Sequence, residues 1–186
     1  MTKYTKISIL LHWLIALAII MQLSSGLWMV QAIKEDEHRL LAYQTYQLHK
    51  SIGLTILILS LFRLFWRFTH KPPALPKNIN NFEKNAAKFS HFILYFLMIA
   101  IPFLGWAMVS INIYGIPTIF FNLFEWPHIK FLINFSDQKQ LDIFIKNAHR
   151  YFSFAMIFLL FIHVAAAIKH HFIKKNNILK RILPFY

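Results

Sequence analysis

The chain has 186 residues, of which 58% are hydrophobic and only 15% are charged. Because a soluble domain carries about 25% charged residues, most of this protein's surface does not face water. The absence of cysteine excludes disulfides, thiolate zinc sites, iron–sulfur clusters and c-type haem attachment. The net charge of +13 lies between apolar segments rather than on one face, which favours contact with anionic membrane lipid and excludes nucleic acid as the partner.

The first apolar stretch covers residues 7–33 and contains no Asp, Glu, Lys or Arg. It is longer than the about 20 residues that a helix needs to cross a bilayer. A cleavable signal peptide has a shorter apolar region that ends in a small-x-small site, and this stretch has neither property. We therefore predict a retained membrane span at about residues 7–31.

The second predicted span covers about residues 46–68, and Pro72 and Pro73 follow it as helix breakers. The third covers about residues 89–111, with Pro102 and Gly105 expected to kink the helix. The residues expected to end this helix are Asn112, Gly115 and Pro117.

The fourth predicted span covers about residues 144–171, and a basic tail follows it. Residues 112–143, which are rich in aromatic side chains, are expected to form a partly interfacial loop. The predicted fold class is therefore all-α: residues 1–186 form a single membrane domain, an integral four-helix bundle.

Charge bias predicts the orientation of this bundle, because loops on the cytoplasmic side carry an excess of Lys and Arg. With both termini cytoplasmic, the inner side has one acidic residue, Glu83, and these basic residues: Lys3, Lys6, Arg67, Lys71, Lys77, Lys84, Lys88, Lys169, Lys174, Lys175, Lys180 and Arg181. The outer side then has a nearly balanced set: Lys34, Arg39, Lys50, Lys130, Lys139, Lys146 and Arg150 against Glu35, Asp36, Glu37, Glu125, Asp137 and Asp142.

Four histidines lie within or at the ends of the predicted spans, where ionisable side chains are costly and usually functional. His149 and His163 are 14 residues apart, which on a helix is about 21 Å along the axis and about 40° in direction. The predicted topology pairs His49 with His149 on the outer side and His12 with His163 on the inner side. Two imidazoles from two helices at each of two depths suit two haem groups.

Other interpretations of the histidines stay open. A single histidine within a span is more often a packing or hydrogen-bonding residue than a ligand. Four histidines can also bind copper or zinc, although two ligands at each depth suit haem better than a tetrahedral ion.

Two glycines agree with the haem interpretation. Gly53 lies one helical turn from His49, and Gly26 follows His12 by 14 residues, which places it level with the outer pair. Without a Cβ, each leaves room for a flat macrocycle. Each can equally mark a close contact between helices.

Basic residues accompany both predicted sites. Arg63 lies 14 residues after His49, level with the inner pair, and is expected to contact a haem propionate there. Its alternative is to extend towards the inner interface. Lys50 and Arg150 follow the outer histidines directly and can contact propionates on that side.

Three further histidines, His91, His170 and His171, are expected on the inner side near the inner pair. They can bind a quinone headgroup or relay its protons, or they can be ordinary interfacial residues. The remaining histidines, His38, His70 and His128, are expected in loops.

The sequence resembles the bacterial cytochrome b561 family of small di-haem, quinone-linked membrane cytochromes. The resemblance covers nearly the whole chain. The stretches that carry it are Ile9-Leu-Leu-His-Trp13, Leu48-His-Lys-Ser-Ile-Gly53, Arg63 and Arg67, Pro72-Pro73, His91-Phe-Ile-Leu-Tyr95, Ile101-Pro-Phe-Leu-Gly105, Ala148-His149, and His163-Val-Ala-Ala-Ala167 through His170-His171 to Arg181 and Pro184. Lys50, Arg150 and the region from Asn112 to Gln140 depart from the family pattern.

The resemblance implies that His12, His49, His149 and His163 are the axial ligands of two haem b groups. It also implies a multi-pass protein of the bacterial inner membrane that passes electrons from an outer donor to the quinone pool, with ubiquinone as acceptor. Some members resemble superoxide oxidases, so superoxide is one candidate donor. The alternatives are an anchor subunit that serves a partner dehydrogenase or hydrogenase, and a haem-free transporter.

Overall fold

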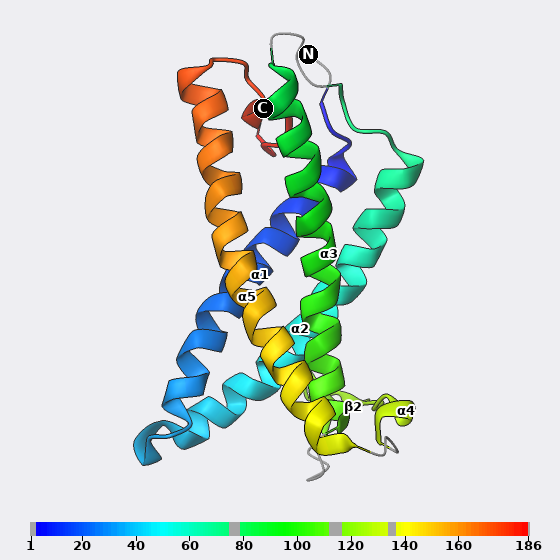
Figure 1. The fold of residues 1–186 in the computed structure, drawn as a ribbon, viewed down its shortest axis with the longest axis vertical. Coiled ribbons are helices and arrows are strands. Elements are labelled where there is room, and N and C mark those ends of the chain that lie inside the picture. The colour runs from blue at the N-terminus through cyan, green and yellow to red at the C-terminus, as the bar shows by residue number, and fades with distance from the viewer. Residues whose placement is uncertain (1–2, 75–78, 112–116, 134–136, 186) are drawn as a thin grey trace.

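Four long helices run the length of the molecule in the computed structural model, which describes residues 3–74, 79–111, 117–133 and 137–185 (Figure 1). Their bounds are Lys6–Ala32 for α1, Arg39–Thr69 for α2, Asn81–Ile111 for α3 and Gln138–Ile168 for α5. Each is long and apolar enough to cross a membrane. The prediction of an all-α membrane protein with four spanning helices is confirmed.

Shorter elements connect and extend these helices. A 3-10 helix, η1 (Asp36–His38), joins α1 to α2, and a π-helix, η2 (Lys169–Ile173), continues α5. The other short elements are β1 (Thr118–Phe120), β2 (Phe124–Trp126), α4 (Lys130–Ile133) and the 3-10 helix η3 (Leu179–Arg181).

The strands form an antiparallel hairpin inside the region that we predicted as a partly interfacial loop. Phe121 and Asn122 at its turn have φ values of 46° and 60°, the left-handed conformation that such tight turns require. The depth of this region in the membrane stays a prediction.

All four helices begin before the predicted spans, α1 by one residue and the others by six to eight, because a helix continues past the apolar core of a bilayer until a residue breaks it. Pro102 lies inside α3, which continues to Ile111. Lys77, Asn112 and Gly115, on which parts of the orientation and helix-end predictions rest, lie outside the described residues.

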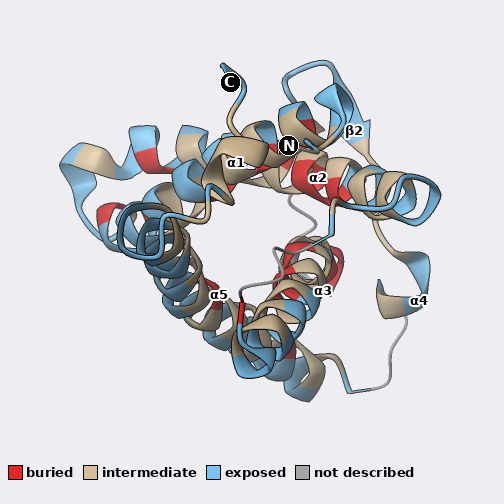
Figure 2. Ribbon diagram, turned by 90° about the horizontal axis from the view of Figure 1, so that it is seen from above, coloured by how far each residue is buried: buried red, intermediate tan, exposed pale blue. Residues whose placement is uncertain are grey.

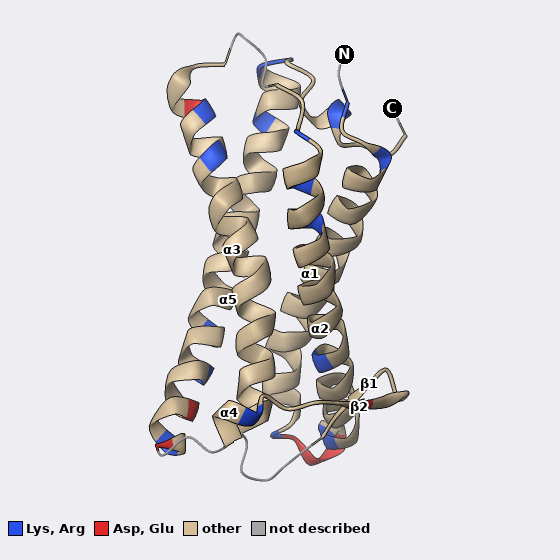
Figure 3. Cartoon of the chain, turned by 90° about the vertical axis from the view of Figure 1, so that its right-hand side faces the viewer, with Lys and Arg blue, Asp and Glu red and all other residues tan. Residues whose placement is uncertain are grey.

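Both ends of the chain lie at one end of the bundle, which we call the terminal end (Figure 1). There the backbone N–H of Tyr4 donates to the carbonyl of Arg181 at 3.4 Å, and Trp13 Nε1 donates to the carbonyl of Ile182 at 2.9 Å. The β-hairpin and α4 lie at the opposite end, which we call the hairpin end. Figure 3 shows that the Lys and Arg positions gather towards both ends of the bundle, with few charged positions in the middle.

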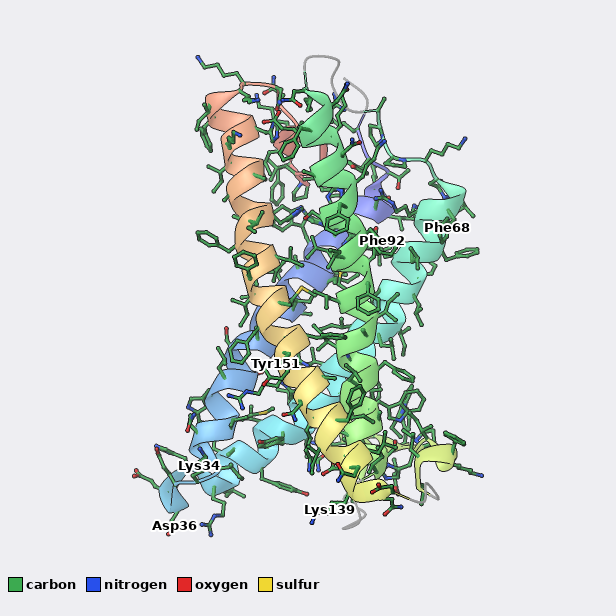
Figure 4. All side chains as sticks on the ribbon, viewed as in Figure 1. Lys34, Asp36, Phe68, Phe92, Lys139 and Tyr151 are labelled. Atoms are coloured by element: carbon green, nitrogen blue, oxygen red, sulfur yellow. The ribbon has the colours of Figure 1, made fainter. Side chains whose placement is uncertain are left out.

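The helices surround an interior in which α1 packs on α2, α2 on α3, and α3 on α5 (Figure 2). At mid-height the packing is tight and mainly apolar: Ile15 is 0% exposed and Met156 is 2% exposed. Large apolar side chains such as Phe68 and Tyr151 lie on the outside, where lipid covers them (Figure 4).

Candidate functional site

A cavity of about 860 Å³ opens among the helices in the hairpin-end half of the bundle, and both His49 of α2 and His149 of α5 line it. Its size is in the upper part of the range of about 300–1,000 Å³ that is common for cofactor sites. Apolar side chains form most of its wall, which is typical of such sites. The two histidines predicted to pair on the outer side therefore face one common space.

His149 is held with its Nε2 available as a ligand. Its Nδ1 lies 3.0 Å from the backbone carbonyl of Ile101 in α3. Because a carbonyl only accepts, Nδ1 carries the proton and the lone pair resides on Nε2. Gly105 makes this position possible, since a Cβ there would lie 3.3 Å from His149 Cε1. A carbonyl on the far ring nitrogen is the usual orienting partner of a metal-bound histidine.

His49 is held in a similar way by α1. Its Nδ1 lies 3.4 Å from Ser25 Oγ, and that oxygen lies 3.2 Å from the carbonyl of Gln22, to which it donates. With the serine hydrogen directed to that carbonyl, Nδ1 of His49 donates to Ser25 Oγ, and Nε2 is again free. A Cβ on Gly26 would lie 3.3 Å from His49 Cε1, as on Gly105 beside His149.

The terminal end brings three histidines together. The ring centroids of His12 and His163 are 6.4 Å apart, and those of His91 and His163 are 5.6 Å apart. Two metal–nitrogen bonds of about 2 Å each, with about 1 Å from each nitrogen to its ring centre, give about 6 Å between the centroids of two imidazoles on one ion. The separation of His12 and His163 fits this arrangement.

Arg63 contacts the same cluster. Its Nη2 lies 3.0 Å from His12 Nδ1, and because a guanidinium only donates, Nδ1 accepts in this arrangement and the proton resides on Nε2. For His12 to bind a metal through Nε2, the proton must move from Nε2 to Nδ1. Nδ1 can then no longer accept from Arg63, so this hydrogen bond must break. The guanidinium groups of Arg63 and Arg67 both lie 5.4 Å from the ring centre of Tyr95.

A family model described as prokaryotic cytochrome b561 matches residues 3–185. The chain belongs to the prokaryotic cytochrome b561 family. Cytochrome b561 homolog 2 of Escherichia coli is 30% identical over 181 residues, which cover 97% of this chain and 91% of that protein. Homolog 1 of the same organism is 25% identical over 186 residues, covering 99% and 98%. A protein named probable superoxide oxidase CybB, of Yersinia pestis, is 28% identical over 189 residues, covering 98% and 96%.

Family membership confirms the predicted resemblance and makes this chain a b-type cytochrome of the bacterial inner membrane that takes part in electron transfer. The cofactor of the family is haem b. The residues at the hairpin end fit that group: two neutral imidazoles have free Nε2 atoms, and a glycine of a neighbouring helix lies against each ring. At the terminal end the distance between the His12 and His163 rings fits a haem, but the proton on His12 must change nitrogen and the hydrogen bond from Arg63 must break.

A bare copper or zinc ion fits less well than haem in this cytochrome b561. Within residues 3–74, 79–111, 117–133 and 137–185, no three His, Asp or Glu side chains lie close enough to hold a metal ion together. A structural zinc site uses four protein ligands and a catalytic one three. Two imidazoles per site instead match the axial set of a haem.

Two of the predicted quinone residues have their described contacts with neighbours in the sequence rather than with the histidine cluster. His170 and His171 belong to the π-helix η2, where His170 Nδ1 lies 2.9 Å from Asn176 Nδ2 and the ring of His171 packs on Phe172. Only His91 of the three has its ring against His163. A π-helix is often found at a functional position, and here it displaces the two histidines from regular α5 geometry.

Lys50 and Arg150 both line the hairpin-end cavity, as their positions directly after His49 and His149 imply. Lys50 Nζ donates to the carbonyl of Pro117 at 3.0 Å and thereby helps to hold the hairpin on α2. The guanidinium of Arg150 lies 6.0 Å from the ring centre of Phe154, outside any ion pair in the described part of the chain.

Sequence reasoning missed Gln22 and Ser25, which contact His49 directly. Gln22 and Ser25 are three residues apart and so share one helix face, but Ser24 and Gln31 of the same span are also polar, so the sequence alone did not single these two out.

Proposed function

We propose that this cytochrome b561 carries two haem b groups, one between His49 and His149 and the other between His12 and His163. The observation that supports this most directly is the placement of one histidine of each pair on the single helix α5, 14 residues apart. About 21 Å of helix separates them. Each then meets a histidine of another helix, one at either end of the bundle.

Haem b, when bound, accepts and releases one electron at a time at its iron. Each histidine would supply a nitrogen ligand to this group, and at the hairpin end the Ile101 carbonyl and the Ser25 hydroxyl orient the rings of His149 and His49. Between the two pairs, Ile15 and Met156 belong to a tightly packed layer of mainly apolar side chains. This layer keeps water out of the middle of the bundle, so that electrons cross it while protons and ions do not.

The terminal end is assigned to the cytoplasm, with both termini inside. Glu83 is the only acidic residue at this end in the described part of the chain, and it is already paired with Lys174 at 2.8 Å and with Lys169 at 3.3 Å. The other basic side chains there give the end a strong positive excess. The positive-inside rule supports this orientation.

Electrons pass from a donor at the outer, hairpin end to a quinone at the inner end, with ubiquinone as the expected acceptor. Superoxide is the proposed donor, and the similarity to the Yersinia pestis protein supports this choice. Two superoxide anions each lose one electron and become O₂, and the quinone takes up two electrons and two protons to become a quinol. Arg150 is the cation best placed to attract the anion, because Lys146 is paired with Asp142 at 2.5 Å.

At the inner end, Arg63 is the expected partner of a haem propionate, and the quinone headgroup is assigned to the region of His91, His170 and His171. His91 lies closest to the ligand cluster, with its ring against His163. An imidazole can both hydrogen-bond to a quinone oxygen and deliver a proton to it. This gives the inner end the two requirements of quinone reduction, a nearby electron carrier and a proton donor.

The two-haem proposal is tested by replacing His163 with alanine and measuring haem per protein together with the reduced-minus-oxidised spectrum. We expect loss of one haem, with the α-band of the other retained. His38→Ala is the matched control, because this half-exposed histidine lies in η1, away from both histidine pairs, and its ring is 3.6 Å from the Glu35 carboxylate. Loss of both haems, or of neither, would show that the pairing is wrong.

The donor is tested on the purified, haem-loaded chain alone. Superoxide generated enzymatically should reduce it and, with ubiquinone added, yield quinol in a ratio of two superoxide to one quinol. If superoxide leaves the haems oxidised while a copurifying dehydrogenase or hydrogenase reduces them, the chain is instead the anchor subunit of that enzyme.

A further inference from the structure

A short segment of α1, from Gln22 to Gly26, contacts His49 at its backbone, its Nδ1 and its ring edge. We call this segment, defined by Gln22, Ser25 and Gly26, the His49 socket. Gln22 and Ser25 are three residues apart and Gly26 is four residues after Gln22, so all three lie on the helix face that meets α2.

Gln22 holds the backbone of the ligand. Its Nε2 donates to the carbonyl oxygen of His49 at 2.8 Å. Gly53 leaves room for this hydrogen bond, because a Cβ there would lie 3.3 Å from Gln22 Nε2. Because Gly53 lets α1 and α2 approach closely, Gln22 can reach the backbone of His49, one turn earlier on α2, and hold it in place.

Ser25 determines which ring nitrogen of His49 carries the proton. Its hydroxyl has a single hydrogen, and the carbonyl of Gln22 at 3.2 Å accepts it. The lone pairs of Ser25 Oγ then face His49 Nδ1 at 3.4 Å, and that nitrogen donates. In the opposite tautomer the Nδ1 lone pair would need the serine hydrogen, and Nε2 would carry a proton that blocks coordination.

The two ligands at the hairpin end therefore have different orienting partners. His149 donates to the backbone carbonyl of Ile101, which no side-chain substitution removes. His49 donates to a side-chain hydroxyl, a weaker acceptor that is already engaged as a donor to Gln22. The acceptor of His49 Nδ1 can therefore be removed by substituting one residue, Ser25, whereas the acceptor of His149 Nδ1 cannot.

We propose that Ser25 is a positioning residue that acts through His49: it fixes the ligating tautomer and adjusts the electron donation of that imidazole, and hence the midpoint potential of the haem that His49 holds. This inference rests on the proposed role of His49 as an axial ligand. An acceptor on the far nitrogen raises the basicity of the ligand, and a more basic ligand favours ferric over ferrous iron. Ser25 therefore lowers the potential of the outer haem and strengthens its binding.

The test compares haem-loaded Ser25→Ala with the unchanged chain in a redox titration followed at the α-bands, and in the rate of haem transfer to excess apomyoglobin. We expect one of the two titration steps to move to higher potential and the other to stay in place. We also expect one haem to leave about tenfold faster, at the low end of the 10–100-fold effects known for such orienting partners.

Two control variants separate this role from a structural one. Ser24→Ala removes the neighbouring exposed hydroxyl, whose donation goes to the carbonyl of Ile20 and not to a histidine, and should change neither quantity. Ser25→Thr keeps the hydroxyl and should restore both values. A potential shift shared by Ser24→Ala would mean that the helix, and not the hydroxyl, is responsible.

The outcomes of this test are distinct from those of the proposed function. A single titration step in the unchanged chain would overturn the two-haem proposal. Two steps in the unchanged chain, with neither step nor the rate of haem loss altered in Ser25→Ala, would overturn the role of Ser25 and leave the haem assignment intact.

Discussion

Gly105→Ala tests most directly whether His149 is held against α3 as a ligand must be. The added Cβ would lie 3.3 Å from His149 Cε1 and 3.6 Å from its Nδ1. The ring cannot move away freely, because its Nδ1 is hydrogen-bonded to the carbonyl of Ile101 at 3.0 Å. The substitution therefore moves the imidazole, or the helix, by a few tenths of an ångström.

The expected magnitude follows from two opposing effects. Overpacking a tight site costs about 1–3 kcal/mol, whereas replacing a helical glycine by alanine gains up to about 1 kcal/mol. The chain itself should thus lose little stability. Haem binding depends on the displaced ligand, and a loss of about 1–2 kcal/mol there corresponds to about 5–30-fold in affinity.

The assay is haem content per protein by pyridine haemochrome, with the rate of haem loss to apomyoglobin as the quantitative measure. We expect accelerated loss of one haem in Gly105→Ala, with the thermal midpoint of the apoprotein nearly unchanged. Gly26→Ala should behave in the same way, because its Cβ would meet His49 Cε1 at the same 3.3 Å.

Gly53→Ala is a graded comparison, not a neutral control: its Cβ would also lie 3.3 Å from its neighbour, but that neighbour is the flexible end of Gln22, so it disturbs His49 only indirectly, through the hydrogen bond from Gln22. The effect of this variant should be clearly smaller. If Gly105→Ala binds both haems as firmly as the unchanged chain, or if Gly53→Ala is the more damaging of the two, the glycine does not serve the ligand and the reasoning is refuted.

Three further outcomes are expected. Met156→Ala, which removes a 2% exposed side chain from the mid-height core, should cost about 2–5 kcal/mol and lower the thermal midpoint in detergent, whereas an unchanged midpoint would mean that the core collapses around it. Ser51→Ala removes the acceptor of the Phe121 N–H at 3.0 Å and a hydroxyl hydrogen that the carbonyls of Gln47 at 3.1 Å and Ile119 at 3.2 Å share, and it should speed amide exchange in the hairpin without changing haem content. Arg63→Leu removes a cation from the inner cluster and should lower the potential of the inner haem only, because positive charge favours the reduced iron; a shift of the outer haem would contradict the assignment.

The membrane spans could be predicted from the sequence because a helix that crosses a bilayer must have an uncharged, apolar run of a minimum length, and this length can be counted directly. The level of each histidine could be predicted for a related reason. A helix rises by about 1.5 Å per residue whatever surrounds it, so 14 residues on α5 specify two depths without any knowledge of packing.

The β-hairpin was not predicted. Its strands are three residues long, and β1 is held on α2 by Ser51, which lies 68 residues from Ile119 in the sequence. Short aromatic runs next to an uncharged span resemble the rest of the apolar sequence, so their periodicity carries little information.

The contacts of the four histidines also depended on the tertiary structure. Helix α1 is apolar on all sides, so no stripe of residues marks the face that meets α2, and the contact of Ser25 with His49 joins residues 24 positions apart. Likewise, sequence spacing put Arg63 level with His12, but only the packing of α1 on α2 directs its guanidinium to a ring nitrogen. The sequence by itself determined that there are four spans and at which depth each histidine lies, because helix geometry is local. Only the tertiary structure decided which atoms hold each imidazole, because those contacts depend on how each helix is rotated against its neighbours.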